Sequence, residues 1–189
     1  SLPEIEPAWS PDGTRIVFTR VLSGGVLERE EKDVWIMNAN GSGQAPVVNI
    51  PGEDHDAVFS LSGERLIISS DKAGTRPFGD TWSVDPFTDS GAVQRNVFKV
   101  NMTANVFAGG GDPSVSPDGT KVVFFKSATR LVVSNLQIWT VRTDATGAAK
   151  RANLGVLNVH PDWGILSDAD VDGIPDYQAP LGFNGPDYF

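Results

Sequence analysis

The sequence contains no cysteine and only two histidines, at positions 55 and 160. The lack of cysteine excludes disulfide scaffolds, thiol nucleophiles and cysteine-ligated zinc or iron–sulfur sites, and two histidines leave little for a histidine-rich metal centre. No run approaches the roughly 20 apolar residues of a membrane span, and the first residues carry neither the basic nor the apolar region of a signal peptide. We therefore expect a mature or excised soluble piece with no membrane span.

Positive charge is also scarce, because 15 Lys and Arg stand against 24 Asp and Glu and give a formal net charge of −9. A surface of this sign repels phosphate, so the composition argues against a nucleic-acid partner. The 189 residues suit one or two domains, and a hydrophobic content of 40% is enough for a core. A helical apolar period is absent, whereas 20 Gly and 13 Pro indicate many turns between short strands.

Three segments of the chain repeat one another. Trp9, Phe59 and Val115 occupy equivalent positions, and a fourth copy begins near Trp163, which gives a period of about 50 residues. Each full copy continues with a turn sequence, an apolar run and a second segment that carries a tryptophan, at positions 35, 82 and 139. Periods of this size are typical of the blades of a β-propeller.

Each copy makes sense as a four-stranded antiparallel blade. In Ser-Pro-Asp-Gly, at residues 10–13 and 116–119, proline and aspartate suit the centre of a turn and glycine accepts the left-handed position that closes a hairpin. The apolar run that follows is continuous, as expected for a strand covered on both faces. We expect blades at about 7–52, 57–105 and 113–157, with weaker fourth strands near 45–50, 94–100 and 150–157. Residues 160–165 would open a fourth blade, the charged stretch 27–33 would be a loop or strand extension, and 108–112 would link two blades.

The run Pro-x-Trp-Ser-Pro-Asp-Gly, followed by an apolar strand and Asp-Val-Trp-Ile-Met, resembles the TolB-type, WD-like propeller repeat. The resemblance is strongest over 7–44, good over 113–147, and degraded over 57–85, where Leu61 and Ser62 replace proline and aspartate. It implies an all-β propeller that binds protein or polymer partners through its loop faces, and it implies no catalytic residue. Similar proteins carry the repeats in the bacterial periplasm, at cell surfaces, or ahead of a serine peptidase domain.

Three blades and one opening strand do not close a ring, since single-chain propellers usually have four to eight blades. Three explanations stay open. The chain is part of a larger protein, its C-terminal segment acts as a cap or fourth blade, or it pairs with another copy so that three plus three blades close a ring.

An acidic segment near the C-terminus has the residue order of a calcium loop. Side-chain oxygens at positions 1, 3 and 5, a glycine at 6, a carbonyl at 7 and an acid at 9 are the donors that such a loop supplies. The predicted ligands are Asp168, Asp170, Asp172, the carbonyl of Ile174, and Asp176. The spacing resembles the loops of thrombospondin type 3 repeats, dockerins and EF-hands. The alternative is a solvated acidic turn.

The loop lacks its usual closing acid, because Ala179 stands at position 12. Asp162, Asp187 or water would then complete the shell, and with water the affinity would fall toward the ~10⁻⁴–10⁻³ M of extracellular modules. The expected role of calcium is structural, ordering residues 165–189. Aromatic residues after the loop would dock on the propeller or on a neighbouring chain: Tyr177, Phe183, Tyr188 and Phe189.

Catalytic and modification motifs are few. Asp54, His55 and Asp56 form an acid–base cluster, but they precede the inner strand expected from residue 57, and His160 has a corresponding place in the fourth copy. This periodic placement favours a loop or packing role over catalysis. The sequence has neither a Gly-x-Ser-x-Gly elbow nor His-Glu-x-x-His, whereas a glycosidase pair of carboxylates stays open. Sequons at Asn40 and Asn101, both expected in loops, would permit a glycan in a glycosylating compartment.

Together, these features predict a non-enzymatic, extracytoplasmic (periplasmic, cell-surface or secreted) propeller module with a structural calcium site, which mediates protein–protein contact or surface assembly. A millimolar-calcium exterior suits a weak site better than the cytosol. One alternative is the propeller domain of a larger exported hydrolase or peptidase whose catalytic part lies outside these residues. Another is a subunit that associates through its open blade edges into a filament or ring.

Overall fold

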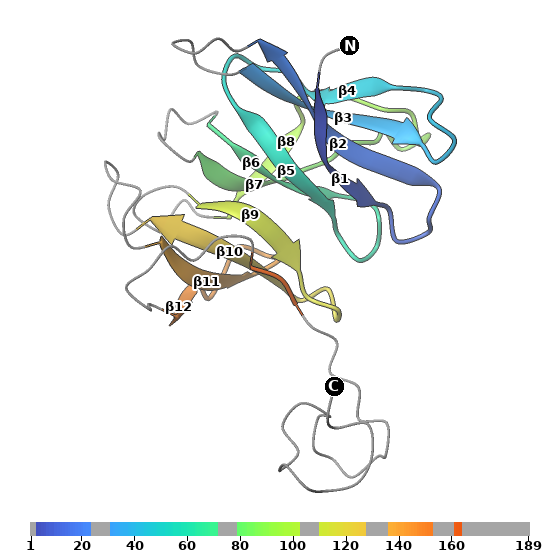
Figure 1. Ribbon diagram of the computed structural model, residues 1–189. Coiled ribbons are helices and arrows are strands. Elements are labelled where there is room, and N and C mark those ends of the chain that lie inside the picture. Colours follow the sequence, from blue (N-terminus) through green and yellow to red (C-terminus); the bar gives the residue numbers. More distant parts are fainter. Residues whose placement is uncertain are drawn as a thin grey trace, which may run out of the picture.

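The computed structural model describes residues 3–23, 31–71, 79–102, 110–127, 136–152 and 161–163. Within these residues the chain forms twelve strands in three four-stranded antiparallel sheets (Figure 1). In this described part of the chain, no helix is long and apolar enough to cross a membrane.

Each sheet is one copy of the repeat, with its four strands in sequence order. Blade 1 consists of β1 (Glu4–Trp9), β2 (Arg15–Ser23), β3 (Glu31–Asn38) and β4 (Ala45–Val48). Blade 2 consists of β5 (Asp54–Phe59), β6 (Leu66–Ser70), β7 (Asp80–Val84) and β8 (Phe98–Asn101). Blade 3 consists of β9 (Gly110–Val115), β10 (Lys121–Ser127), β11 (Leu136–Arg142) and β12 (Ala149–Ala152). The prediction of three four-stranded antiparallel blades is confirmed.

The turn between the first two strands of blade 1 is built by Asp12. Its Oδ1 accepts hydrogen bonds from Ser10 Oγ (2.6 Å) and from the backbone N–H of Thr14 (3.0 Å), and Gly13 takes the left-handed conformation at φ 68°. Asp118 repeats these contacts in blade 3. Blade 2 has Ser62 at this position. Its Oγ lies 3.3 Å from Ser60 Oγ and accepts a 3.4 Å bond from the Glu64 N–H, so both contacts are longer than those of Asp12. The degraded turn sequence of blade 2 therefore keeps the turn with weaker bonds.

Burial of the second strand on both faces holds the blades together. In β6 all five residues are buried, and the centres of β2 and β10 are buried as well. One apolar cluster joins blades 1 and 2 and includes Val17, Val34, Phe59, Leu66 and Ile68. A second joins blades 2 and 3 and includes Ile67, Val122, Phe124 and Val141. The core thus lies between blades, as expected for strands covered on both sides.

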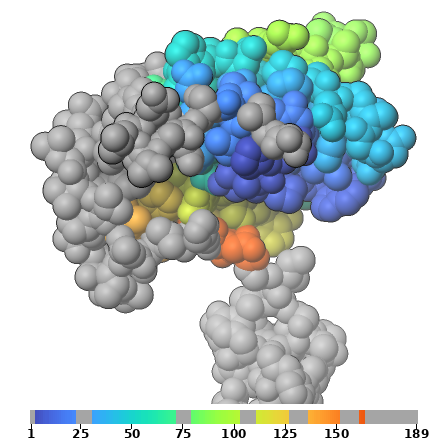
Figure 2. Space-filling view, turned by 45° about the horizontal axis from the view of Figure 1, so that its top comes forward, coloured from blue at the N-terminus to red at the C-terminus, as the bar shows by residue number. Residues whose placement is uncertain are grey.

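The first strand of each later blade packs against the blade before it. β5 contacts β1, β2 and β3, and β9 contacts β5, β6 and β7. The described segment 161–163 lies beside β9, where Trp163 Nε1 donates to the carbonyl of Ser114 (3.0 Å). In Figure 2 this segment is the orange-red patch beside the yellow of blade 3, and β1 and β2 form the blue surface above. The arrangement is a partial propeller.

Four sequence-based boundaries were wrong, and three of them share a cause. β1 begins at Glu4 and not at residue 7. β5 begins at Asp54 and β9 at Gly110, so the Asp54–Asp56 cluster and the expected linker at 110–112 lie inside first strands. Each first strand pairs irregularly around its centre, and the apolar pattern marks only the part after this bulge. β8 begins at Phe98 and not near 94, because Gln94 Nε2 instead donates to the Phe87 carbonyl (2.6 Å) in a separate turn. Residues 31–33 belong to β3, which agrees with the strand extension that was one of the two alternatives for the charged stretch 27–33.

Candidate functional site

An acidic residue occupies the same place in the first strand of each blade. Glu6, Asp56 and Asp112 each stand three residues before the repeat positions Trp9, Phe59 and Val115. All three have left-handed backbone conformations, with φ of 53°, 52° and 48°. Such values are uncommon for residues other than glycine, and a bulge of this kind re-aims its side chain. The repeat therefore places three carboxyl groups in equivalent positions.

These carboxyl groups are linked from blade to blade. Glu6 Oε2 accepts from Thr19 Oγ1 (2.8 Å) and from the backbone N–H of Asp56 (3.1 Å). The side chain of Asp112 in turn lies close enough to that of Asp56 to lower the pKa of Asp56. We call Glu6, Asp56 and Asp112 the carboxylate row.

The carboxylate row borders a cavity of about 320 Å³. Its walls come from β1, β5 and β9 and from Pro161 and Asp162. Asp162 Oδ1 accepts from Ser114 Oγ (2.6 Å), which fixes the fourth wall to blade 3. The cavity thus lies where the first strands of successive blades meet.

His55 adds a titratable group next to the carboxylate row. Its Nδ1 lies 2.8 Å from Asp56 Oδ2. Burial lowers the pKa of the imidazole, but the hydrogen bond with Asp56 and the charges of Asp56 and Glu6 outweigh it, so the pKa of His55 is raised. Burial also opposes the charge on Asp56, yet its hydrogen bond with His55 and the side chain of Asp112 hold the pKa of Asp56 well below its usual range. The pair is therefore stabilised as an imidazolium and a carboxylate.

The same residues have the donors for a metal ion. Among the described residues, one ligand atom each from Glu6, His55 and Asp56 lies within 4.8 Å of the others. Carboxylate and imidazole donors suit a divalent cation of the first transition series. The alternative to a metal site is that Glu6, His55 and Asp56 serve only to hydrogen-bond with one another. These bonds link the first strands of blades 1 and 2.

The outer face of blade 1 differs from the corresponding faces of blades 2 and 3. Trp9 is 60% exposed, whereas its equivalent in blade 2, Phe59, is 7% exposed and packs against blade 1. The repeat position is therefore one that a preceding blade covers.

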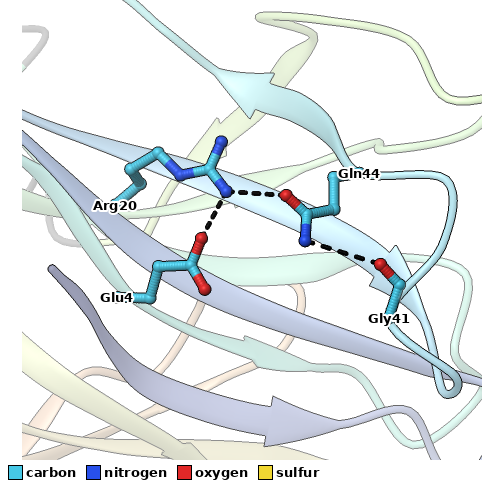
Figure 3. Close-up of polar contacts among 4 residues, drawn as sticks. All are labelled: Glu4, Arg20, Gly41 and Gln44. Carbon is cyan, nitrogen blue, oxygen red and sulfur yellow. Dashed lines mark hydrogen bonds and ion pairs between the residues drawn. The ribbon is translucent and has the colours of Figure 1, made fainter. Parts of the chain in front are cut away.

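The same face of blade 1 carries a polar cluster around Arg20 (Figure 3). The guanidinium forms an ion pair with Glu4, donates to Gln44 Oε1 (2.8 Å) and lies 3.9 Å from the ring centroid of Trp35. Gln44 in turn donates to the Gly41 carbonyl (3.4 Å). These contacts order the face without covering Trp9.

The predicted calcium ligands Asp168, Asp170, Asp172, Ile174 and Asp176 lie outside the described residues, as does His160. The sequence alignment pairs His160 with Asp56 and not with His55. Asn40 is exposed in a turn, as expected. Asn101, expected in a loop, ends β8 instead, and its Nδ2 donates to Asp80 Oδ2 (2.9 Å).

No family model matches the sequence, and no curated protein matches it either. Solved structures do match. TolB from Agrobacterium tumefaciens is 19% identical with a TM-score of 0.65, over 85% of this chain and 53% of that one. The β-propeller domain of the Trilobed protease from Pyrococcus furiosus is 10% identical with a TM-score of 0.50, over 81% of this chain and 44% of that one.

The fold is that of a β-propeller. TolB from Acinetobacter baumannii agrees, at 18% identity and a TM-score of 0.59, over 84% of this chain and 34% of that one. At these identities the likeness concerns the fold alone. The chain spans about half of the first TolB structure and about a third of the second.

The carboxylate row was missed from the sequence, although its signal was present. The repeat alignment began at Pro7, Ala57 and Pro113, one residue after each acid. An extension by one residue would have found an acid in all three copies. The exposure of Trp9 had no such signal, because it depends on what packs against blade 1.

Proposed function

We propose that the chain is a non-enzymatic β-propeller module that makes a protein–protein contact through the outer face of blade 1. The observation that carries the proposal is the exposure of Trp9, at a repeat position that is buried in blade 2 (Phe59) and partly buried in blade 3 (Val115), where a preceding blade is present. A large exposed aromatic side chain is a typical anchor of a protein interface, where tryptophan is enriched.

The partner at this face is a propeller blade. Blade 2 packs Phe59 against blade 1, and Val115 of blade 3 is packed at the cluster between blades 2 and 3, so the repeat uses this position for contact between blades. A blade at the outer face of blade 1 comes either from another part of a longer chain or from a second copy. Both sources extend the ring at its open side.

The calcium loop at residues 168–176 belongs to the same proposal as a structural site. Its residue order supports it, and bound calcium would stabilise the C-terminal segment by mass action. An extracytoplasmic location follows from this proposal, since a weak calcium site fills only where calcium is millimolar. The similarity to TolB structures supports the propeller part alone.

A second candidate is the propeller domain of a larger exported hydrolase or peptidase. The similarity to the propeller domain of the Trilobed protease supports it, as does the fact that this chain covers only part of each similar structure. A third candidate is a subunit of a homomeric filament or ring, in which the outer face of blade 1 binds another copy.

Sedimentation velocity over a range of protein concentrations tests the contact. We expect the wild-type chain to associate as its concentration rises, and Trp9→Ser to reduce that association. Leu61→Ser is the matched control, because Leu61 is also a large exposed apolar residue (54%) but lies on the turn side of blade 2.

The same sedimentation experiment with and without a calcium chelator distinguishes the role of the calcium loop from that of the outer face of blade 1. A chelator should weaken association if calcium orders an interface, and should leave it unchanged if the blade face acts alone. A chain that stays monomeric at every concentration, with and without calcium, would contradict homomeric contact and leave the larger-protein candidate.

A further inference from the structure

The three blades carry a matching layer of residues across their first three strands. Directly paired residues lie on one face of a sheet. In blade 1 this layer is Glu4, Arg20 and Asp33, in blade 2 it is Asp54, Ser70 and Asp80, and in blade 3 it is Gly110, Lys126 and Gln137. The layer therefore has two acids around a cation in blade 1, a lone cation in blade 3, and two acids around a serine in blade 2.

The central cation of the layer stacks on the tryptophan of the third strand. Arg20 lies 3.9 Å from the ring centroid of Trp35, and Lys126 Nζ lies 4.4 Å from that of Trp139. In blade 2 the corresponding Trp82 instead contacts Phe98 edge to face, with centroids 5.3 Å apart. Blade 2 has lost the cation but has kept both acids.

Asp54 shows the consequence of this loss. Its side chain is fully buried (0% exposed), and neither carboxyl oxygen has a hydrogen bond of good geometry, although the Ser70 hydroxyl and the Ile50 backbone favour its charge. Its blade 1 equivalent, Glu4, forms an ion pair with Arg20. A buried carboxylate with such weak contacts is destabilising, and either a proton or a cation would offset its charge.

The surroundings of Asp54 are acidic. Asp80 is buried on the same face of blade 2, where its Oδ2 accepts from Asn101 Nδ2 (2.9 Å). Asp71 is buried directly after β6, close enough to disfavour the charge on Asp54. A cation at this level of the blade would offset the charge that burial and Asp71 disfavour on Asp54.

We propose that blade 2 binds a calcium ion in the seam with blade 1, with Asp54, Asp80 and the Ser70 hydroxyl as ligands, in the place that Arg20 and Lys126 fill in blades 1 and 3. Carboxylate and hydroxyl oxygens are hard donors of the kind that Ca²⁺ takes, and water can supply the remainder of its shell. The site is separate from the predicted loop at residues 168–176.

Calcium titration in a background without the C-terminal loop tests the site. We would replace Asp168 and Asp170 by asparagine in the full chain, and measure the melting temperature at pH 8 with chelator and with millimolar Ca²⁺. We expect Ca²⁺ to raise the melting temperature of this background by a few degrees. Adding Asp54→Asn or Asp80→Asn should abolish the shift, and Glu4→Gln is the control that should retain it.

A tethered cation gives a second test. Ser70→Lys places in blade 2 the residue that blade 3 has, and should remove the calcium response. If this variant does not fold, Asp54→Asn still decides the proposal.

Two results would overturn the proposal. One is a melting temperature of the loop-free background that does not respond to Ca²⁺. The other is a calcium shift that survives Asp54→Asn. If the loop-free background does not respond to Ca²⁺, the melting temperature of Asp54→Asn in chelator is compared with that of the background. A higher value for the variant would indicate that a proton, and not a cation, neutralises Asp54 in the folded chain. If the wild-type chain responds to Ca²⁺ and the loop-free background does not, the response comes from the loop at residues 168–176. That result would contradict the seam site alone, and would not bear on the contact at Trp9.

Discussion

Blades 1 and 2 have the same four strands in the same order, yet they differ at two repeat positions that decide their roles. Trp9 is exposed where Phe59 is buried, and Arg20 forms an ion pair with Glu4 where Ser70 lies beside the buried carboxyl group of Asp54. The repeat therefore determines the position of a side chain within its blade, and the neighbouring blade determines whether that side chain is buried or exposed. Within the described part of the chain, Trp9 on the outer face of blade 1 is exposed, and Asp54 of blade 2 is a fully buried carboxyl group without the cation that Glu4 has in blade 1.

The largest expected effect comes from the two equivalent aromatic residues. Phe59→Ala should lower the free energy of unfolding by about 3–5 kcal/mol, because it leaves a cavity between blades 1 and 2. Trp9→Ala should change it by no more than about 0.5 kcal/mol in the monomer, since the side chain is mostly exposed. Urea denaturation at low protein concentration checks the pair. Equal losses would show that Trp9 packs within the chain.

The second effect is a pH dependence that belongs to blade 2. Burial, with the charges of Asp71 and Asp33, raises the pKa of Asp54 to about 7. Between about pH 4 and pH 7 the folded chain then holds a proton that the unfolded chain has released, so stability falls as pH rises through this window. Other ionisable groups at this seam are Lys32, Glu53, His55 and Asp80.

Asp54→Asn should flatten that fall. Melting curves from pH 4 to pH 8 in chelator, for the wild type and for this variant, give the comparison. A slope that Asp54→Asn leaves unchanged would place the titration elsewhere, for example at Asp33, whose pKa burial and the charge of Glu31 raise to about 6.

A smaller effect is expected at the polar cluster of blade 1. Arg20→Ala removes an ion pair with Glu4 and a stacking contact with Trp35, and should cost about 1–2 kcal/mol. The Glu4→Gln control keeps the stacking contact and should cost less. Equal costs for the two variants would mean that the indole contributes nothing to the cluster.

The smallest effect concerns the turn of blade 2. Replacing Leu61 by Pro and Ser62 by Asp restores the turn sequence of blades 1 and 3, and should raise stability by about 0.5–1 kcal/mol. The part of the gain that comes from the new aspartate should fall as pH falls toward 2, because hydrogen bonds with Ser10 and Thr14 lower the pKa of the equivalent Asp12 to about 2, whereas the part that comes from proline should persist. Denaturation at pH 7 and pH 2 checks both statements.

The sequence predicted the blades because each one is encoded locally. A turn with Gly13, a continuous apolar strand and a tryptophan such as Trp35 recur in order, and each has a direct structural cause. The first-strand boundaries were wrong because the left-handed bulges at Glu6, Asp56 and Asp112 interrupt the apolar pattern. The burial of Asp54 and the exposure of Trp9 depend on contacts between blades, which the repeat pattern does not contain.

The most direct measurement of the open blade face uses the absence of cysteine from the chain. Single thiols introduced as Trp9→Cys and Phe59→Cys report how accessible each equivalent position is, because thiol labelling requires exposure. At low protein concentration the thiol at position 9 should react rapidly and the thiol at position 59 slowly, and raising the concentration should protect position 9 alone. A thiol at position 9 that is protected at every concentration, or reactive at every concentration, would contradict an open face that binds another blade in trans.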